Sequence, residues 1–353
     1  MIKKLKKDQY DLVFLTNSPA FYKINLFNRI SEKINIFVFF LTPQNDIVVK
    51  EANISRYSFD YLFLTEQYLK KRNKLKVFLK LLNKLQTIQY KKIIYSSWIY
   101  PEFIISSFIT PKYKNCMVCE SSIYESKIYG IKKHIKKIIA NRISVVLPSG
   151  ISNKQIFDSL GYKGKIILTG GVGLFNKNTK RGNITHKPSQ SFKYLYVGRL
   201  IDIKNLDLLI EVFNQNGKSL TIVGNGELKE PLKLKANFNI SFSGFVENEK
   251  MYSIYQDHDI FILPSKSEPW GLVVEEAIYN SLPVIVSNKV GCNIDMVQQP
   301  NTGLIFQYDD KLSLQSAIEE MERNYSLFKD NVNRYDFEKR DRRQISVYMQ
   351  LVR

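Results

Sequence analysis

Residues 10–41, YDLVFLTNSPAFYKINLFNRISEKINIFVFFL, decide the fold class of the first half of the chain. An apolar run at 10–15 ends in the turn-forming residues TNSP, and apolar side chains then recur with helical spacing over 21–30. A continuous apolar run at 34–41 follows and reads as a second buried strand. A strand, a helix and a strand in this order predict a βαβ unit with parallel strands.

The same alternation of short apolar strands and helices continues along both halves of the chain. The further expected strands lie at 91–97, 115–121, 143–149, 193–198, 219–224, 240–244, 260–265 and 283–287. Parallel strands joined by helices have both faces of their sheet covered, so this pattern predicts an α/β fold with two doubly wound, Rossmann-like domains. Because such sheets bind ligands beyond the carboxyl ends of their strands, we expect the domains to face a central cleft.

A polar segment at 176–192, NKNTKRGNITHKPSQSF, separates the two halves and is expected to be an interdomain linker. The predicted domains are an N-terminal domain at 1–175 and a C-terminal domain at 193–335. A last helix at 336–353 is expected to return to the N-terminal domain.

The whole chain of 353 residues has a formal net charge of +19, and its positive charge is concentrated in the first half. Residues 1–170 carry 29 Lys and Arg against 11 Asp and Glu, whereas residues 171–353 carry 23 against 22. With 44% hydrophobic residues, the composition is that of an ordinary globular protein and excludes disordered and fibrous classes. A basic charge confined to one domain predicts that this domain faces an anionic surface or substrate.

The cysteines and the apolar runs indicate the compartment. CMVC at 116–119 has metal-like spacing, but Cys292 alone cannot complete a set of four zinc ligands. We therefore expect buried thiols in a reducing cytoplasm. The apolar stretch at 12–15 is too short for a signal peptide, and no run approaches the roughly 18 residues of a membrane span. The expected protein is cytoplasmic and touches a membrane from its inner face.

One motif of the second half suits a diphosphate. YVGRLIDIKN at 196–205 places Arg199 and Lys204 beyond the carboxyl end of an expected strand, next to Gly198. Two cations there can bind a diphosphate by charge-assisted hydrogen bonds. A solvated loop is an equally open interpretation of these residues alone.

A second motif is weaker. TIVGNGEL at 221–228 places Gly224 and Gly226 after a strand, where the backbone can approach a nucleotide closely. The segment lacks the third glycine of a dinucleotide-binding fingerprint, so a plain turn stays open.

SEPWGLVVEEA at 267–277 contains two acids eight positions apart, Glu268 and Glu276. Pro269 and Gly271 prevent one continuous helix, so Glu268 is expected in a loop and Glu276 about one turn inside a helix. The amides of such a helix start form an anion site, and carboxylates on its two sides can accept hydrogen bonds from sugar hydroxyls. A solvated Glu268, and Glu275 rather than Glu276 as the ligand, stay open, as does a pair of carboxylates for glycoside hydrolysis.

The second half as a whole resembles the retaining GT-B glycosyltransferases of family 4. The resemblance rests on YVGRLIDIKN, VGNGEL, SFSGFVENEKMYSIYQDHDIFILPS, SEPWGLVVEEAIYNSLPVIVS and NTGLIF, in this order, between about 194 and 308. The first half is similar to that family mainly in layout.

The resemblance implies a role for each matching residue. It assigns the donor diphosphate to Arg199 and Lys204, the transferred sugar to Glu268 and the ribose to Glu276. Further donor contacts are implied at Gly198, Gly224, Gly226, Phe245, Val246, Trp270, Gly271 and Leu272, with Phe245 and Val246 on the base. No cofactor and no metal are expected, because the cations and the helix amides balance the diphosphate.

This chain departs from the family pattern at two places, and a third segment superficially matches the metal motif of another glycosyltransferase architecture. TGGVGLF at 169–175 is similar to a family hinge but lacks its Pro, Asn and Asp. Glu120 stands where several members have a sugar-contacting His. DHD at 257–259 has the spacing of a metal motif, but it precedes a strand rather than following one, so no metal role is expected.

The basic half contains two amphipathic segments, at 68–85 and 129–142. The first is expected to place Leu75, Phe78, Leu79, Leu82 and Leu85 on one stripe with lysines around it. Such helices suit anionic membrane surfaces, while core-packed helices with solvated lysines are the alternative. In the family architecture the first domain receives the acceptor, so a lipid-linked saccharide is expected there, with Asn17, Ser18, Lys23 and Glu120 as candidate contacts.

The sequence thus predicts a retaining, metal-independent hexosyltransferase that uses a nucleotide diphosphate sugar and builds bacterial surface polysaccharide, such as lipopolysaccharide, O-antigen or capsule. Two alternatives stay open: a nucleotide-sugar 2-epimerase of the same fold, and a basic nucleic-acid-binding protein. The chain has no aromatic-plus-glycine RNA signature, helix-turn-helix or finger spacing, so no nucleic-acid partner is expected.

Overall fold

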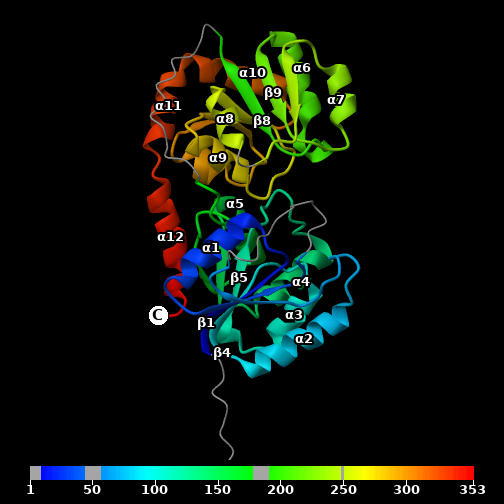
Figure 1. Ribbon diagram of the computed structural model, residues 1–353, viewed down its shortest axis with the longest axis vertical. Helices are drawn as coiled ribbons and strands as arrows, with labels where there is room; N and C mark the ends of the chain where they lie inside the picture. The colour runs from blue at the N-terminus through cyan, green and yellow to red at the C-terminus, as the bar shows by residue number, and fades with distance from the viewer. Residues whose placement is uncertain (1–8, 44–56, 178–190, 248–249) are drawn as a thin grey trace, which may run out of the picture. The chain divides into compact units, whose positions relative to one another are not determined.

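The computed structural model describes residues 9–43, 57–177, 191–247 and 250–353. The chain divides into two compact units. The first comprises Met1–Glu120, Ser126–Asn176 and Glu338–Arg353, and the second comprises Ser121–Glu125 and Lys177–Phe337. Each unit is built on one parallel sheet (Figure 1). Most of the expected linker lies outside the described residues. Residues 121–125, which the sequence places in the first domain, group instead with the second unit.

The first unit contains a seven-stranded parallel sheet in the order β3-β2-β1-β4-β5-β6-β7. Its strands are β1 Gln9–Thr16, β2 Ile36–Phe40, β3 Asp60–Phe63, β4 Gln89–Tyr95, β5 Asn115–Cys119, β6 Val145–Pro148 and β7 Lys165–Ile166. Its helices are α1 Phe21–Ser31, α2 Lys74–Thr87, α3 Pro101–Ile109, α4 Gly130–Ala140 and α5 Ile151–Leu160, together with α12 Phe337–Gln350. The βαβ unit predicted for 10–41 is confirmed, with Leu12 of β1 aligned to Ile36 of β2.

The second unit contains a six-stranded parallel sheet in the order β10-β9-β8-β11-β12-β13. Its strands are β8 Lys193–Val197, β9 Ser219–Val223, β10 Ile240–Gly244, β11 Ile260–Leu263, β12 Val284–Ser287 and β13 Gly303–Phe306. Its helices are α6 Leu206–Asn216, α7 Lys229–Lys235, α8 Met251–Gln256, α9 Leu272–Tyr279, α10 Lys311–Arg323 and α11 Tyr325–Arg334. Strands β11 and β12 are buried along their whole length, as expected for a parallel sheet covered on both faces.

Both sheets are doubly wound, because the strand order reverses once in each. In the first unit the reversal lies between β1 and β4, and in the second it lies between β8 and β11. Loops that leave neighbouring strands in opposite directions open a crevice at the carboxyl ends of these strands, which is where open α/β sheets bind ligands. The topology therefore directs attention to the segments that follow β1, β4, β8 and β11.

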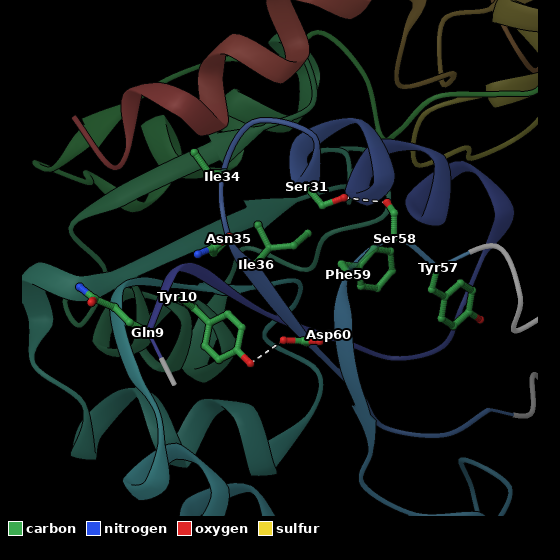
Figure 2. A pocket seen from close by; sticks show the side chains of 10 residues that line it. All are labelled: Gln9, Tyr10, Ser31, Ile34, Asn35, Ile36, Tyr57, Ser58, Phe59 and Asp60. Atoms are coloured by element: carbon green, nitrogen blue, oxygen red, sulfur yellow. Dashed lines mark hydrogen bonds between the residues drawn. The ribbon is translucent and has the colours of Figure 1, made fainter. Parts of the chain in front are cut away.

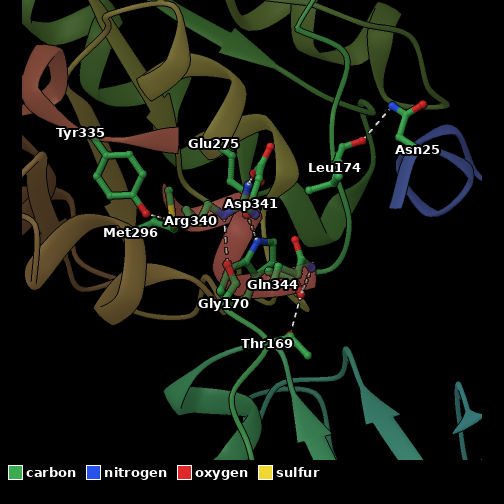
Figure 3. A network of polar contacts seen from close by, with 12 residues as sticks. Asn25, Thr169, Gly170, Leu174, Glu275, Met296, Tyr335, Arg340, Asp341 and Gln344 are labelled. Carbon is green, nitrogen blue, oxygen red and sulfur yellow. Dashed lines mark hydrogen bonds and ion pairs between the residues drawn. The ribbon is translucent and has the colours of Figure 1, made fainter. Parts of the chain in front are cut away.

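The helix α12 is held against the first unit by the segment at 169–175 (Figure 3). The Arg340 guanidinium donates to the Gly170 carbonyl at 3.0 Å, and the Gln344 amide donates to the Gly171 carbonyl at 2.9 Å. Both side chains are buried. Buried polar side chains that reach backbone carbonyls fix the position of a helix, because breaking the bonds would leave these groups unsatisfied. The hinge-like segment TGGVGLF therefore anchors α12 in this chain.

The two basic helices differ in how much of their apolar surface is covered. In α2 the buried row is Val77, Leu81 and Leu85, whereas Leu75 and Leu79 are exposed. Four of the five residues expected on one stripe, Leu75, Phe78, Leu79 and Leu82, lie outside this buried row, whereas Leu85 belongs to it. Among the described residues, no helix combines the length and apolarity required to cross a membrane.

Candidate functional site

The loops that follow β8 and β11 are tied together at the switch point of the second unit. The Lys266 amide donates to the Ile203 carbonyl at 2.9 Å, and the Asn205 side chain donates to the Pro264 carbonyl at 3.1 Å. The Lys266 ammonium also lies 2.6 Å from the Asp202 carboxylate. These contacts hold the segment carrying Arg199 and Lys204 beside the segment carrying Glu268.

Two of the predicted site residues contact each other directly. The Lys204 ammonium and the Glu268 carboxylate form an ion pair, and their side chains are 12% and 16% exposed. The Ser265 hydroxyl lies 3.5 Å from the same Glu268 oxygen. The pairing of Lys204 with Glu268 was not predicted, since the resemblance assigns the two residues to different parts of the donor.

Arg199 differs from Lys204 in being free. It is exposed, and within the described part of the chain its guanidinium forms no hydrogen bond or ion pair. An uncommitted guanidinium in the loop that also carries Lys204, beyond the end of a parallel strand, is available to bind a phosphate in a bidentate manner.

The helix α9 begins at Leu272, so Glu268 lies ahead of the helix and Glu276 inside it, as the sequence predicted. Gly271 precedes Leu272 and has φ +104°, in the left-handed region that favours glycine. Glu268 accordingly lies in the loop ahead of the helix, and the first amides of α9 have no intrahelical partner by construction. A helix start is partially positive, so this end of α9 adds to the charge of Arg199.

The two neighbouring glutamates of α9 have different environments. Glu275 is fully buried and accepts a hydrogen bond from the Trp270 indole at 2.5 Å. Glu276 is partly buried and accepts from the Tyr255 hydroxyl of α8 at 3.2 Å. Because Glu275 is committed to Trp270, Glu276 is the better candidate for a ligand contact. Burial raises the pKa of Glu276 to about 7, although the Tyr255 hydrogen bond opposes this and Glu275 adds to it.

Glycines bring the backbone of the site loops together. A Cβ on Gly224 would lie 1.8 Å from the Gly198 carbonyl oxygen, and one on Gly226 would lie 2.2 Å from the Leu200 carbonyl oxygen. From the sequence alone, Gly224 and Gly226 are expected because they let the backbone approach a nucleotide closely. In the structure, the neighbouring backbone already requires them, because they let the loop carrying Arg199 lie against the segment after β9.

Phe245 and Val246 follow β10, at the same carboxyl edge of the sheet. Phe245 is 71% exposed and Val246 is partly buried. An exposed aromatic ring at the edge of a ligand-binding crevice is suited to stacking on a planar base.

Residues 121–125 contact this site and were missed by the sequence reasoning. The Ser122 hydroxyl donates to the Glu268 carbonyl at 3.4 Å, and the Asn293 amide donates to the Tyr124 hydroxyl at 3.4 Å. The Lys289 ammonium lies 5.3 Å from the centre of the Tyr124 ring. No periodicity or spacing marks such a contact, because it depends on where the chain leaves β5.

The candidate residues of the first unit also gather at a carboxyl edge. The Lys23 ammonium of α1 lies 3.0 Å from the Glu120 carboxylate, which follows β5, and 3.5 Å from the Thr16 hydroxyl at the end of β1. Burial alone would lower the pKa of Lys23, but Glu120, together with Tyr22 and Tyr100, outweighs it, so the pKa lies above its ordinary value. Asn17 and the buried Ser18 follow β1 directly. This edge therefore presents a fixed carboxylate together with neutral polar groups.

A hollow on the first unit lies away from these residues. Figure 2 shows that it is lined at the beginnings of β1, β2 and β3, where the Tyr10 hydroxyl donates to Asp60 at 2.6 Å. The amino ends of parallel strands are the edge opposite to the usual ligand site. We therefore place this hollow outside the candidate functional site.

The residues expected to be structural have structural partners. Cys116, Cys119 and Cys292 are buried thiols, and burial raises the pKa of Cys116 to about 11. In the DHD motif, Asp259 accepts a hydrogen bond from the Lys193 amide at 2.9 Å, at the amino end of β8. Among the described residues, no group of three or more metal-ligating side chains is assembled.

Comparison with known proteins gives a match to a family model in the second half of the chain. Residues 178–340 match the family model described as glycosyl transferases group 1. The sulfoquinovosyl transferase SQD2 of Arabidopsis thaliana is 33% identical over 120 residues, which are 33% of this chain and 24% of that protein. The O-antigen biosynthesis glycosyltransferase WbnH of Escherichia coli is 33% identical over 142 residues, which are 39% of this chain and 40% of that protein. The chain thus matches less than half the length of either relative.

A solved structure matches along nearly the whole chain. Anabaena HepE, solved in complex with UDP-glucose, covers 97% of this chain and 99% of its own length with a TM-score of 0.70 and 18% identity. At this identity the match shows the fold alone. The predicted fold class, two parallel-sheet Rossmann-like domains as in GT-B glycosyltransferases, is confirmed.

Proposed function

We propose that this chain, whose residues 178–340 match the group 1 glycosyl transferases, is a glycosyltransferase that uses a nucleotide diphosphate sugar as its donor. One observation carries the proposal. At the switch point of the second unit, Arg199, the Lys204–Glu268 ion pair and the start of α9 lie in loops that are bonded to each other. Cations at a helix start suit a diphosphate, and a carboxylate beside them suits the hydroxyls of an attached sugar.

The geometry of the second unit supports a different set of residues for each part of the donor. Arg199, Lys204 and the first amides of α9 would bind the diphosphate, and Phe245 would stack on the base. Glu268 would hold the transferred sugar and Glu276 the ribose. Stabilising the negative charge that develops on the leaving diphosphate would then be the main catalytic task.

The reaction is proposed to retain the configuration of the sugar and to need no metal. A transfer on the donor's own face lets the leaving phosphate take the proton of the acceptor hydroxyl, so no protein nucleophile is required. The cations named above supply the positive charge for which other glycosyltransferases use a metal ion. The match to HepE, solved with UDP-glucose, supports a nucleotide sugar as donor.

The acceptor is proposed to be a lipid-linked saccharide of a bacterial surface polysaccharide. The similarity to the O-antigen glycosyltransferase WbnH supports this substrate class. In the first unit, Glu120 and Asn17 offer acceptors and donors for sugar hydroxyls at the carboxyl edge of the sheet. The place proposed for the enzyme is the inner face of the cytoplasmic membrane.

The helix α4 supports contact with an anionic membrane. Ile131, Ile135 and Ile138 lie on one stripe of this helix and are 76%, 50% and 56% exposed, and four lysines flank them. Only its last residues, Ile139 and Ala140, are buried. Three exposed isoleucines within a basic helix are unfavourable in water but suit an anionic bilayer interface.

Exposed apolar side chains also lie at the end of α3. The Arg142 guanidinium, which directly follows α4, lies 5.6 Å from the centre of the Phe108 ring and donates to the Phe108 carbonyl at 3.3 Å. Phe108 and Ile109 of α3 are 45% and 60% exposed. Arg142 therefore joins the segment that follows α4 to the end of α3, where these two apolar side chains are exposed.

Replacing Ile131, Ile135 and Ile138 together with serine is expected to lower binding to vesicles at least about tenfold, because each isoleucine contributes apolar area at the interface. The measurement is co-sedimentation with vesicles containing about 30% phosphatidylglycerol. Leu234→Ser is the matched control, since Leu234 of α7 is 89% exposed but lies in the second unit. Unchanged binding of the triple variant, or equal binding to neutral vesicles, would contradict the membrane proposal.

The donor itself is tested by a thermal-shift series with UDP-glucose, UDP-galactose, GDP-mannose and free nucleotides. A true donor at about 100 times its Kd should stabilise the second unit by about 2.7 kcal/mol, and Arg199→Ala should remove most of that shift. Release of nucleoside diphosphate that depends on an added saccharide acceptor would support transfer. Conversion of the sugar without an acceptor would instead favour the epimerase, and binding of nucleic acid with no response to any nucleotide sugar would refute the proposal.

A further inference from the structure

The ion pair between Lys204 and Glu268 affects how a ligand can bind in the site. Both side chains are largely buried, at 12% and 16% exposure, and Glu268 uses the same oxygen for Lys204 and for Ser265. The diphosphate-binding cation and the sugar-binding carboxylate of the proposed function are therefore bonded to each other. A ligand that takes one of them must separate the pair.

We propose that Glu268 is a built-in counter-ion, which the donor's diphosphate displaces from Lys204 so that the released carboxylate can accept hydrogen bonds from the sugar. This inference rests on the proposed function and adds to it a way in which the site distinguishes a nucleotide sugar from a nucleotide without a sugar. A nucleotide that carries a sugar compensates Glu268 for the loss of Lys204, whereas a nucleotide without a sugar leaves Glu268 unpaired. The pair thus penalises the product of transfer relative to the donor.

The surroundings of the pair support an exchange of anions rather than a permanent structural bridge. Glu268 is held in place by its backbone, since its amide donates to the Lys289 carbonyl at 3.0 Å and its carbonyl accepts from the Gly291 amide at 2.9 Å. Lys204 is likewise fixed through its own amide, which donates to the Ile201 carbonyl at 2.9 Å. The side chains can therefore separate while both loops keep their positions.

Arg199 provides the place where a displacing anion can first bind. Its guanidinium is exposed and has no partner among the described residues, whereas Lys204 is neutralised by Glu268. A diphosphate that binds Arg199 through one phosphate would compete for Lys204 through the other. The competition is between two anions for one partly desolvated cation, where charge–charge interactions are stronger than in water.

The test measures the binding of inorganic pyrophosphate, UDP and GDP to four variants by calorimetry, without divalent metal. Glu268→Gln is expected to bind pyrophosphate at least about fivefold more tightly than the unmodified protein, because Lys204 no longer has a competing anion. Lys204→Met should bind it at least about tenfold more weakly. In the Lys204→Met background, Glu268→Gln should have no further effect, which makes the double-mutant cycle diagnostic. Glu320→Gln, an exposed acid on α10, controls for the change in net charge.

A second measurement concerns the attached sugar. The ratio of the affinities for UDP-glucose and UDP, or for GDP-mannose and GDP if only guanosine nucleotides bind, should fall in Glu268→Gln. The neutral amide is a weaker acceptor for sugar hydroxyls, and the free nucleotide is no longer penalised. Melting curves of each variant show whether it is folded before binding is compared.

The outcomes separate this inference from the proposed function. If the unmodified protein binds nucleotides and Glu268→Gln binds pyrophosphate no more tightly, the counter-ion proposal is wrong and the transferase proposal stands. If neither the unmodified protein nor Glu268→Gln binds pyrophosphate or any nucleotide at millimolar concentration, the cations form no diphosphate site and both proposals fail.

Discussion

Replacing Gly291 with alanine is expected to lower the melting temperature of the second unit by about 6–12 °C, corresponding to about 3 kcal/mol, and to abolish donor binding. A Cβ at this position would lie 1.9 Å from the Pro269 carbonyl oxygen and 3.1 Å from the Glu268 carbonyl oxygen. Both are backbone atoms, so no side chain can rotate away to relieve the collision. The loop carrying Glu268 would have to move.

That movement would break the contacts that place Glu268. The segments 268–270 and 289–292 are joined by three backbone hydrogen bonds of 2.9–3.0 Å, from Glu268 to Lys289, from Gly291 to Glu268 and from Cys292 to Trp270. Lengthening these hydrogen bonds by more than an ångström would leave their amide and carbonyl groups exposed to water or without a partner. It would also shift the Glu268 carboxylate relative to Lys204.

Gly217→Ala is the matched control for this prediction. Gly217 lies in the same unit with φ +68°, and a Cβ there would meet no atom within 4 Å. Alanine at Gly217 therefore costs only the left-handed backbone conformation, about 1–2 kcal/mol, and should leave donor binding unchanged. The explanation from steric collision is refuted if the two variants lose the same stability, or if Gly291→Ala retains full affinity for the donor.

The elements that the sequence predicted well are those whose burial makes them apolar throughout. Strands such as β2 and β11 are buried on both faces, so their letters form continuous apolar runs. The strands β3, β7 and β13 were missed for a corresponding reason. DYLF of β3 is only partly buried at one edge of its sheet, β7 has two residues at the other edge, and GLIF of β13 begins with a glycine. Edge strands contact fewer neighbours, so their sequences are less constrained.

For the candidate site, sequence spacing predicted which residues share an edge but not what they bond to. Arg199, Lys204 and Glu268 follow β8 and β11, and the reversal of strand order brings these loops together. The choice between Glu275 and Glu276 depends on the rotation of α9, which places Glu275 where it accepts a hydrogen bond from the Trp270 indole. The contact of Ser122 with Glu268 depends on tertiary structure alone. Contacts between side chains of this kind produce no periodic pattern in a sequence.

The second large effect is expected at Glu276, where glutamine should stabilise the protein at alkaline pH and weaken donor binding. Burial raises the pKa of Glu276 to about 7 from an ordinary value of 4.5. The folded state therefore binds this proton more tightly than the unfolded state does. Stability from this group is fully present below pH 4.5 and is lost as the pH rises through 7.

The size of the effect follows from the difference between the two pKa values. At 1.36 kcal/mol per pKa unit the difference corresponds to about 3 kcal/mol, and the partial exposure of Glu276 reduces it to about 2 kcal/mol. Glu276→Gln removes the ionisation and keeps an oxygen that can accept the Tyr255 hydrogen bond. Its melting temperature should exceed that of the unmodified protein by about 4–8 °C at pH 8, and by much less at pH 5.

Two further variants define the cause. Tyr255→Phe removes a hydrogen bond that lowers the pKa of Glu276, so it should steepen the loss of stability with rising pH. Glu320→Gln, on the exposed face of α10, should change the melting temperature equally at pH 5 and pH 8. If Glu276→Gln shows no greater advantage at pH 8 than at pH 5, the buried carboxylate is not the source of the pH dependence. If the Glu276→Gln variant is stabilised and still binds the nucleotide sugar with full affinity, Glu276 has no role in holding the ribose. Its carboxylate would then destabilise the folded protein without binding a ligand.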